Sequence, residues 1–534
     1  MAARVRATMG ATLAVALGVA SCLGACGSAA PAKPSVVPMA DVIPAPVSAH
    51  PDPGADFSLT AATVLVSPGG AATTPTDWLA ALLRRGTGFS LPVVAPGGHA
   101  SSRIVLKVDG SDLTIGDHGY ILEISNSQVL IRANAGEGLF DGAETLRQLL
   151  PATIETAHSP GPWAVEGGQI TDYPLYPWRG ASLDVARHFF PVSDVERYID
   201  EVALYKIDVL HLHLSDDQGW RIAISAYPTL TSVGGSTAVG GGTGGYYTQA
   251  EYQQIVAYAA GRYITVVPEI DMPGHSNAAL ASLPQLDCGG KVPPVYTGID
   301  SGISTLCVGT AATGQYVSTV LGELAAITPG PYIDIGGDED TLLSGSEYDA
   351  FVNQAAQTVV ADGKIPVGWA DIATTDDAQG TTATLPTGTL TEYWNYQSAP
   401  PDTGQNSSEK LKLIFAPADH AYLDQKYDPG TTLGLDWAGP VSVEQAYDWE
   451  PTDYGVPSGE IEGVEAALWS ETLTSMADIE YMAFPRLPGI AEIAWSPPST
   501  HSWSAYRERL AAQAPRWQAM GINYYRAPDV PWPS

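Results

Sequence analysis

Short apolar segments recur through the last two thirds of the chain. Each ends in polar or aromatic residues, and most are followed by a segment with helical spacing, such as residues 192–205, 249–260 and 347–362. Eight strands alternating with helices predict a (β/α)8 TIM barrel, in which functional side chains lie at the carboxyl ends of the strands. The eight predicted strands are residues 180–184, 209–214, 264–267, 332–335, 365–369, 388–394, 411–416 and 463–469.

The pattern before residue 174 is different. Four runs rich in Val, Ile and Leu predict strands, and residues 77–85 and 138–150 have apolar positions at helical spacing. Strands with helices on one face form a small α+β domain. We therefore predict an α/β protein with a non-catalytic α+β domain over residues 56–173 and a catalytic barrel over residues 174–534. The predicted strands of the first domain are residues 62–67, 103–108, 120–125 and 128–133.

The first 26 residues have the features of an export signal. Arg4 and Arg6 precede an apolar run that is too short to span a bilayer, and small residues lead to Cys26. This ending resembles the lipobox of bacterial lipoproteins, with Cys22 as a weaker second candidate and an ordinary cleaved signal peptide as the alternative. The Pro- and Ala-rich residues 27–55 are typical of a tether. We expect an exported protein, held on the outer face of the cell membrane by lipid on Cys26 or otherwise secreted.

Composition narrows the possible partners and the compartment. The chain has 25 basic and 58 acidic residues, a net charge of −33 that argues against nucleic acid as a partner. At 45% hydrophobic residues it can bury a large core. In an oxidising compartment Cys288 and Cys307 are expected to form a disulfide rather than two free thiols.

Acidic and aromatic side chains gather at the predicted strand ends. Aromatic faces stack on pyranose rings, while carboxylates bind hydroxyls and protonate glycosidic oxygens, so the set predicts a sugar site. The candidates are Asp216, Asp217, Glu269, Asp271, Asp338, Glu339, Trp369, Trp394, Tyr422, Asp424, Trp469 and Glu471.

Two of these motifs have other interpretations. The sequence GGDE at 336–339 could cap a helix, and it also occurs in the turn of nucleotide cyclases, although those need intracellular GTP. His211 and His213 share a strand face and, with Asp216, could bind zinc; the alternative is hydrogen-bonded histidines inside the barrel. No third histidine has a typical metallohydrolase spacing, so we expect neither a metal nor another cofactor.

Seven motifs occur in the order found in one family. On these motifs the chain resembles the β-N-acetylhexosaminidases of glycoside hydrolase family 20, over nearly all of the sequence that follows the export signal. The motifs are GLFDGAETLRQLLP (138–151), WRGASLDVARHF (178–189), HLHLSDDQGWR (211–221), PEIDMPGH (268–275), GGDE (336–339), YLD (422–424) and LWSE (468–471).

The resemblance implies roles for individual residues. In this family the 2-acetamido oxygen of the substrate attacks the anomeric carbon, so the enzyme supplies no nucleophile, an exception among retaining glycosidases. Glu339 would act as acid and base with a raised pKa, and Asp338 would hold the acetamide N–H. The remaining roles fall to Tyr422, Trp369, Trp394 and Trp469 around the acetamide, to Arg179, Asp424 and Glu471 at ring hydroxyls, and to Asp216 and His275 as a relay orienting Glu339.

One position departs from the family pattern. The family commonly has histidine two residues before the glycine pair, where this chain has Asp334. A buried carboxylate near Glu339 could raise the pKa of the acid, or the change could mark altered specificity or lost activity. The expected substrate is a small sugar or oligosaccharide with terminal GlcNAc or GalNAc. The alternatives are a non-catalytic surface sugar-binding lipoprotein, release of a disaccharide such as lacto-N-biose, and a metal-dependent hydrolase.

Overall fold

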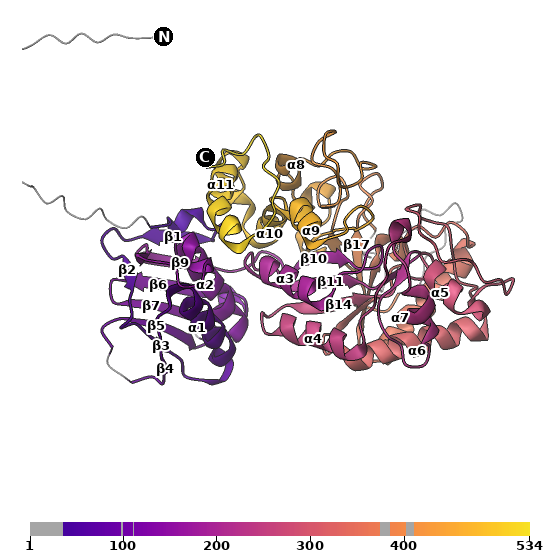
Figure 1. Cartoon of the computed structure of the whole chain (residues 1–534), viewed down its shortest axis with the longest axis horizontal. Helices are drawn as coiled ribbons and strands as arrows, with labels where there is room; N and C mark the ends of the chain where they lie inside the picture. Colours follow the sequence, from indigo (N-terminus) through magenta and orange to yellow (C-terminus); the bar gives the residue numbers. More distant parts are fainter. Residues whose placement is uncertain (1–35, 98–99, 111, 374–384, 402–410, 534) are drawn as a thin grey trace, which may run out of the picture. The chain divides into compact units, whose positions relative to one another are not determined.

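A computed structural model describes residues 36–97, 100–110, 112–373, 385–401 and 411–533 of the chain (Figure 1). The predicted signal peptide and Cys26 lie outside the described residues. Among the described residues, no helix combines the length and the apolar character that crossing a membrane requires.

The amino-terminal domain is a seven-stranded sheet with two helices packed on it (Figure 1). The four strands predicted from the sequence are confirmed as β3, β5, β6 and β7, and the two predicted helices as α1 (Thr73–Thr87) and α2 (Gly136–Leu149). In sheet order the strands are β1 (Ser48–Pro51), β9 (Gly168–Asp172), β6 (Tyr120–Ser125), β7 (Gln128–Ala133), β5 (Arg103–Val108), β3 (Val64–Val66) and β4 (Val93–Val94); β2 (Phe57–Leu59) pairs with β8 (Trp163–Val165).

The predicted tether over residues 27–55 is wrong for the part that the structure describes. β1 pairs with β9 in the sheet, and Met39, Val42 and Ile43 are fully buried. The backbone N–H of Ile43 donates to Gln148 on α2 at 3.0 Å. A Pro-rich composition suggested an extended linker, but a few apolar side chains suffice to anchor such a segment when a partner surface exists.

The rest of the chain forms the predicted barrel, a closed ring of eight parallel strands. Every predicted barrel strand is confirmed, with ends that differ by at most three residues. In ring order the strands are β10 (Trp178–Asp184), β11 (Val209–His213), β14 (Thr265–Glu269), β15 (Tyr332–Asp334), β16 (Ile365–Trp369), β17 (Leu390–Tyr393), β18 (Lys412–Phe415) and β19 (Ile461–Ala466). A small hairpin, β12 (Ser215–Asp216) and β13 (Gly219–Trp220), follows β11.

Helices cover the barrel, and their ends follow local sequence signals. Thr248 and Glu251 form a capping box at the start of α4, which satisfies backbone N–H groups that the helix itself leaves free. The helices are α3 (Val192–Ala203), α4 (Gln249–Ala260), α5 (Asn277–Ser282), α6 (Ala311–Ile327), α7 (Gly345–Ala361), α8 (Val443–Tyr447), α9 (Met476–Ala483), α10 (Leu487–Trp495) and α11 (Trp503–Met520).

The barrel interior contains two chemically different layers. Near the amino ends of the strands, apolar side chains pack together; they are Trp178, Val209, Val267, Val367, Leu390 and Ile414. Toward the carboxyl ends the buried side chains become ionisable; they include His211, His213, Glu269, Asp334, Glu392 and Glu465. The apolar layer closes the lower end of the barrel, so the polar chemistry is confined to the upper half.

Candidate active site

The predicted catalytic pair follows β15 on a sharp turn. Gly336 and Gly337 have φ of +67° and +99°, in the left-handed region that favours glycine. A Cβ on Gly336 would lie 2.0 Å from Asp271 Oδ1, and one on Gly337 would lie 2.4 Å from Ile372. Only glycine therefore fits at either position. Glu339 itself has φ of +53°, a strained conformation that often marks functional sites.

Both carboxyl groups of the pair face one imidazole. His275 Nε2 lies 3.7 Å from Asp338 Oδ2 and 3.6 Å from Glu339 Oε2. The Asp338 side chain is 15% exposed and that of Glu339 is 37% exposed. Asp338 therefore forms the floor of the site, while Glu339 lies at its opening, where a leaving group would depart.

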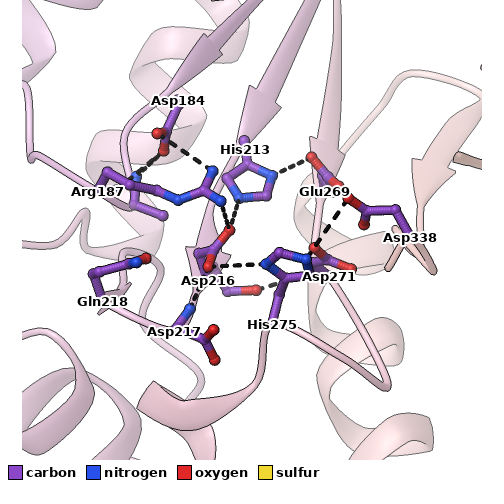
Figure 2. A network of polar contacts seen from close by, with 12 residues as sticks. Asp184, Arg187, His213, Asp216, Asp217, Gln218, Glu269, Asp271, His275 and Asp338 are labelled. Carbon is purple, nitrogen blue, oxygen red and sulfur yellow. Dashed lines mark hydrogen bonds and ion pairs between the residues drawn. The ribbon is translucent and has the colours of Figure 1, made fainter. Parts of the chain in front are cut away.

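A buried relay lies behind the pair, as expected from Asp216 and His275 (Figure 2). His275 Nδ1 is 3.2 Å from Asp216 Oδ1. The other oxygen of Asp216 is 2.6 Å from Arg187 Nη2 and 3.0 Å from His213 Nε2. These contacts hold the pKa of Asp216 well below its usual range although the side chain is buried. Asp216 thus stays ionised and orients His275 toward Asp338 and Glu339.

The protonation of the pair in the free protein corrects one expectation. A raised pKa was predicted for Glu339, but its polar contact with His275 at 3.6 Å lowers that pKa. Burial instead raises the pKa of Asp338 to about 7. In the free site a proton therefore resides on Asp338 rather than on Glu339. A ligand that covers Glu339 would exclude water from its carboxyl group, which favours the neutral acid and so moves the proton to Glu339.

Asp334 is not beside Glu339, contrary to the proximity expected from the sequence. Its Oδ1 accepts the N–H of Gly336 at 2.7 Å, and its Oδ2 lies 3.7 Å from His211 Nε2 inside the barrel. Glu269 on the neighbouring strand is paired with it in register. Asp334 therefore belongs to the polar layer under the site.

The aromatic candidates form one connected wall. The rings of Trp369 and Trp469 have centroids 5.6 Å apart, and Tyr422 lies 6.0 Å from Trp469. Trp369 Nε1 donates to Glu269 at 2.9 Å, which fixes the plane of the ring. Trp394 Nε1 donates to Asp371 Oδ2 at 2.8 Å. The structure thus brings Trp369, Trp469 and Tyr422 into contact, and Trp394 is linked to Tyr422 through the ring of Trp437.

Asp371 was missed by the sequence analysis. Its Oδ1 accepts the backbone N–H of Glu339 at 3.4 Å, so it ties the catalytic turn to Trp394. It follows β16 two residues after Trp369, and a polar residue after a strand was the available signal.

Asp424 and Glu471 also lie close together. Burial raises the pKa of both groups. The charge of Glu471 raises the pKa of Asp424 further, and the charge of Asp184 does the same for Glu471. Asp424 Oδ1 receives no hydrogen bond from the described residues. A buried acid with an open acceptor position, Asp424, beside a partly buried acid, Glu471, suits the binding of sugar hydroxyls.

The prediction for Arg179 is wrong. Arg179 lies at the amino end of β10, with Nη2 2.7 Å from Asp208 and Nε donating to the carbonyl of Lys206 at 2.8 Å. Ligands bind at the opposite end of such a barrel. The motif at residues 178–189 contains two arginines, and the substrate role was predicted for the one at the amino end of β10.

Arg187 occupies the place predicted for Arg179. Its guanidinium lies 4.9 Å from the ring of Trp469 and beside Asp216. Nε and Nη1 donate no hydrogen bond to the described residues, although Nη1 is 3.5 Å from Asp184 (Figure 2). Two buried donors in a sugar site are available to ring hydroxyls.

Trp437 is a second missed residue. Its ring is 49% exposed and packs edge-on against Trp394, with centroids 6.1 Å apart, and against Tyr422 at 5.8 Å. It lies in a segment without regular structure after Asp424, and no strand pattern pointed to it.

The structure contains the expected Cys288–Cys307 disulfide, which closes a loop beside the catalytic turn. Thr305 within this loop donates to Asp340 at 2.5 Å. The disulfide therefore holds the loop against the residue that follows Glu339.

The histidines considered for a metal site lie among carboxylates. His213, Asp216 and Asp271 are close enough together to hold an ion, as are several other buried triads. Yet His213 is hydrogen-bonded through both ring nitrogens, to Glu269 and to Asp216. With both nitrogens at carboxylate oxygens, the ring acts as a double donor, the state that its raised pKa of about 10 favours.

Comparisons with known proteins agree with this site. The glycosyl hydrolase family 20 catalytic domain matches residues 176–346 and 340–498, and domain 2 of the same family matches residues 39–173. A β-N-acetylhexosaminidase from Cellulomonas fimi is 41% identical over 500 residues, which cover 93% of this chain and 98% of that protein.

Solved structures extend the similarity to the fold. The β-N-acetylhexosaminidase from Streptomyces coelicolor A3(2) has a TM-score of 0.87 and 49% identity, covering 93% of this chain and 100% of that one. A mutant β-hexosaminidase from Streptomyces plicatus in complex with the product GlcNAc has the same TM-score and identity, with 93% and 99% coverage.

A TIM barrel with paired acids and an aromatic wall at its carboxyl end defines a glycoside hydrolase. The chain belongs to glycoside hydrolase family 20, the β-N-acetylhexosaminidases. It is thus an enzyme rather than the non-catalytic sugar-binding protein considered above, and its amino-terminal domain is the family's second domain.

Proposed function

We propose that this enzyme removes terminal β-linked GlcNAc or GalNAc from glycans with retention of configuration, using the acetamido group of the substrate as the nucleophile. The observation that supports this most is the Asp338–Glu339 pair. The two carboxyls differ in exposure, both face His275, and Asp371 links the backbone of Glu339 to Trp394. Two adjacent acids of different character suit two different roles.

In the first step the acetamido oxygen attacks the anomeric carbon and the glycosidic bond breaks. Glu339 gives its proton to the departing oxygen, and an oxazolinium ion forms. Asp338 accepts the acetamide N–H and stabilises the positive charge that develops there, while the Tyr422 hydroxyl donates to the acetamide oxygen. Trp369, Trp394 and Trp469 hold the arm in place, since a fixed geometry removes much of the entropic barrier.

In the second step water attacks the anomeric carbon from the face that the leaving group vacated. Glu339 takes a proton from this water, the ring of the oxazolinium opens, and the β-anomer is released. Arg187, Asp424 and Glu471 bind ring hydroxyls in both steps. Sugar binding covers Glu339 and raises its pKa, while the acetamide N–H favours ionised Asp338, so the substrate itself places the proton on the acid.

Chromogenic β-GlcNAc and β-GalNAc, with the first-formed anomer followed by NMR, test this proposal. Turnover with release of the β-anomer is expected, and Asp338→Asn should lose roughly 10²–10⁴ in kcat. No turnover of either monosaccharide, or a near-normal rate for Asp338→Asn, would contradict it. Turnover only of a substrate that releases a disaccharide would indicate a lacto-N-biosidase.

We also propose that the protein is exported and anchored through lipid on Cys26, which rests on the sequence alone. Membrane fractionation checks this: the wild-type protein should sediment with membranes, whereas Cys26→Ser should be soluble in the same compartment. Equal solubility of both proteins would favour the ordinary signal peptide.

A further inference from the structure

One imidazole in the barrel interior is surrounded by four carboxyl groups. His211 Nε2 lies 3.0 Å from Glu269 Oε2 and 3.7 Å from Asp334 Oδ2. His211 Nδ1 lies 2.8 Å from Glu465 Oε1 and 3.6 Å from Glu392 Oε2. All four acidic side chains are fully buried, and that of His211 is 2% exposed.

The four acids differ in the hydrogen-bond donors they meet. Glu269 is approached at one oxygen by Trp369 Nε1 at 2.9 Å and at the other by His211 and His213. Glu465 is approached by Trp178 Nε1 at 3.0 Å and by His211. These two acids have a donor at each oxygen, which is the environment of an ionised carboxylate.

Asp334 and Glu392 lack such donors. Asp334 Oδ1 accepts the N–H of Gly336, but Oδ2 receives no hydrogen bond from the described residues. Neither oxygen of Glu392 receives one from them either. An ionised carboxylate without donors is very costly in a dry interior, and such a group takes up a proton instead.

Within the part of the chain that the structure describes, the other strands supply no compensating positive charge. Facing this layer, β10 contributes Gly180 and Trp178, β16 contributes Trp369, and β18 contributes the apolar Ile414. A Cβ on Gly180 would lie 2.2 Å from Glu465 Oε2, so the glycine makes room for that carboxylate. The two histidines of β11 are thus balanced by Glu269 and Glu465, and the described residues bring no cation other than His211 to Asp334 and Glu392.

This layer connects to the catalytic acid through continuous contacts. From Asp334 the contacts run through His211 to Glu269, which is the branch point. One oxygen of Glu269 holds Trp369 of the aromatic wall, and the other contacts His213. From His213 the contacts continue to Asp216 and His275 (Figure 2). His275 Nε2 in turn lies 3.6 Å from Glu339 Oε2.

We propose that Asp334 and Glu392 are positioning residues that work as neutral acids: their protons keep the His211–Glu269 contact intact, and Glu269 in turn keeps Trp369 and the His213–Asp216–His275 relay in place. Loss of either proton adds an unbalanced negative charge inside the barrel. His211 would then be drawn from Glu269 toward the new charge, and the wall and the relay would lose their common support. This inference rests on the proposed hexosaminidase activity.

An aryl N-acetyl-β-glucosaminide with a strongly acidic phenol leaving group provides the sharpest test. Such a phenol departs with little help from a general acid, so ionisation of Glu339 no longer limits its release. Hydration of the oxazolinium needs Glu339 as a base, which alkaline pH favours. If kcat still falls at alkaline pH with this substrate, the ionisation of groups other than Glu339 causes the fall.

Wild-type kcat on this substrate is expected to fall above about pH 8, the value to which burial raises the pKa of Asp334. Asp334→Asn keeps the shape and the acceptor for Gly336 N–H but cannot ionise, and Glu392→Gln is the equivalent change on β17. Asp334→Asn should move the alkaline fall upward by roughly one pH unit, about a tenfold higher kcat at a pH where the wild type has declined. Glu392→Gln should move it upward by less, because Asp334 can still ionise. The double variant should move it furthest.

The matched control is Glu462→Gln, an acid on the same β19 strand as Glu465 that pairs with Lys412 at 2.8 Å and not with the interior layer. Its pH profile should equal that of the wild type. If Asp334→Asn and Glu392→Gln lower kcat equally at every pH, or leave the alkaline fall where it is, the two acids are merely structural and the proposal is overturned.

A second readout does not depend on activity. A neutral carboxylic acid has a carbonyl band in the infrared spectrum that a carboxylate lacks, and at neutral pH each variant should lose one such band. Absence of any change would show that Asp334 and Glu392 are ionised and would overturn the proposal. Absence of turnover in a folded enzyme that keeps these bands would instead count against the proposed function.

Discussion

Arg179 and Arg187 lie toward opposite ends of β10, and each pairs with a buried aspartate. Arg179 is 1% exposed at its side chain, and it donates to two carbonyls and to Asp208. Arg187 is 9% exposed and contacts Asp216, but Nε and Nη1 donate no hydrogen bond to the described residues.

This difference separates an arginine that holds the fold from one that is ready for a ligand. Buried polar groups nearly always have hydrogen-bond partners, because a buried group without one destabilises the fold. Such a group is tolerated where a bound ligand supplies the missing hydrogen bond. At the amino end of the barrel the protein supplies every partner. At the carboxyl end it leaves donors and acceptors open.

The largest expected effect is on stability, at Arg179. Arg179→Ala leaves the buried Asp208 without its partner and should lower the free energy of unfolding by about 3–5 kcal/mol. The folded fraction should keep its kcat/KM. Chemical denaturation with a parallel activity assay measures both, and a stable but inactive variant would return Arg179 to the substrate site.

Arg187→Ala should act in the opposite way. Loss of hydrogen bonds from a charged donor is expected to weaken transition-state binding by about 3 kcal/mol, a drop in kcat/KM of roughly 10². Initial rates on chromogenic β-GlcNAc and a denaturation curve form the measurement. A large loss of stability with unchanged kcat/KM would make Arg187 a structural residue like Arg179.

A smaller effect is expected in the pH dependence of stability. Burial raises the pKa of Asp338 from 3.8 to about 7, so the folded protein holds this proton where the unfolded chain has lost it. The contribution of Asp338 to stability is therefore present below about pH 4 and is lost as the pH rises toward 7.

Asp338→Asn removes this titration. Relative to the wild type, its Tm should rise steadily between pH 4 and pH 7 and then level off. Glu462→Gln serves as the control, and a Tm difference independent of pH would contradict the raised pKa.

The smallest effect is expected at the open rim. Trp437→Ala should raise KM by several-fold, on the order of 1 kcal/mol for one exposed aromatic contact, with little change in Tm. Tyr173→Ala, an exposed aromatic 37% accessible just after β9, is the control and should change neither. An unchanged KM for Trp437→Ala would place the substrate away from this rim.

The sequence alone determined the order of elements and most of the site. Eight apolar segments specified the barrel strands because parallel strands are buried on both faces and leave a strong local signal. The motifs at their ends identified Asp338, Glu339, Asp216, His275 and the aromatic wall. Strands β1, β2, β4, β8 and β9 were missed, since strands of two to five residues carry little pattern of their own.

Tertiary structure decided at which end of a barrel strand each side chain lies and which buried charges have an oppositely charged partner. Arg179 and Arg187 stand in one motif, and only the direction of β10 separates their roles. The anchoring of residues 39–51, the shift of the proton from Glu339 to Asp338, and the position of Asp334 beside His211 all depend on neighbours that are distant in sequence. Hydrogen-bond satisfaction and desolvation are properties of the assembled site, so no local pattern of residues could have encoded them.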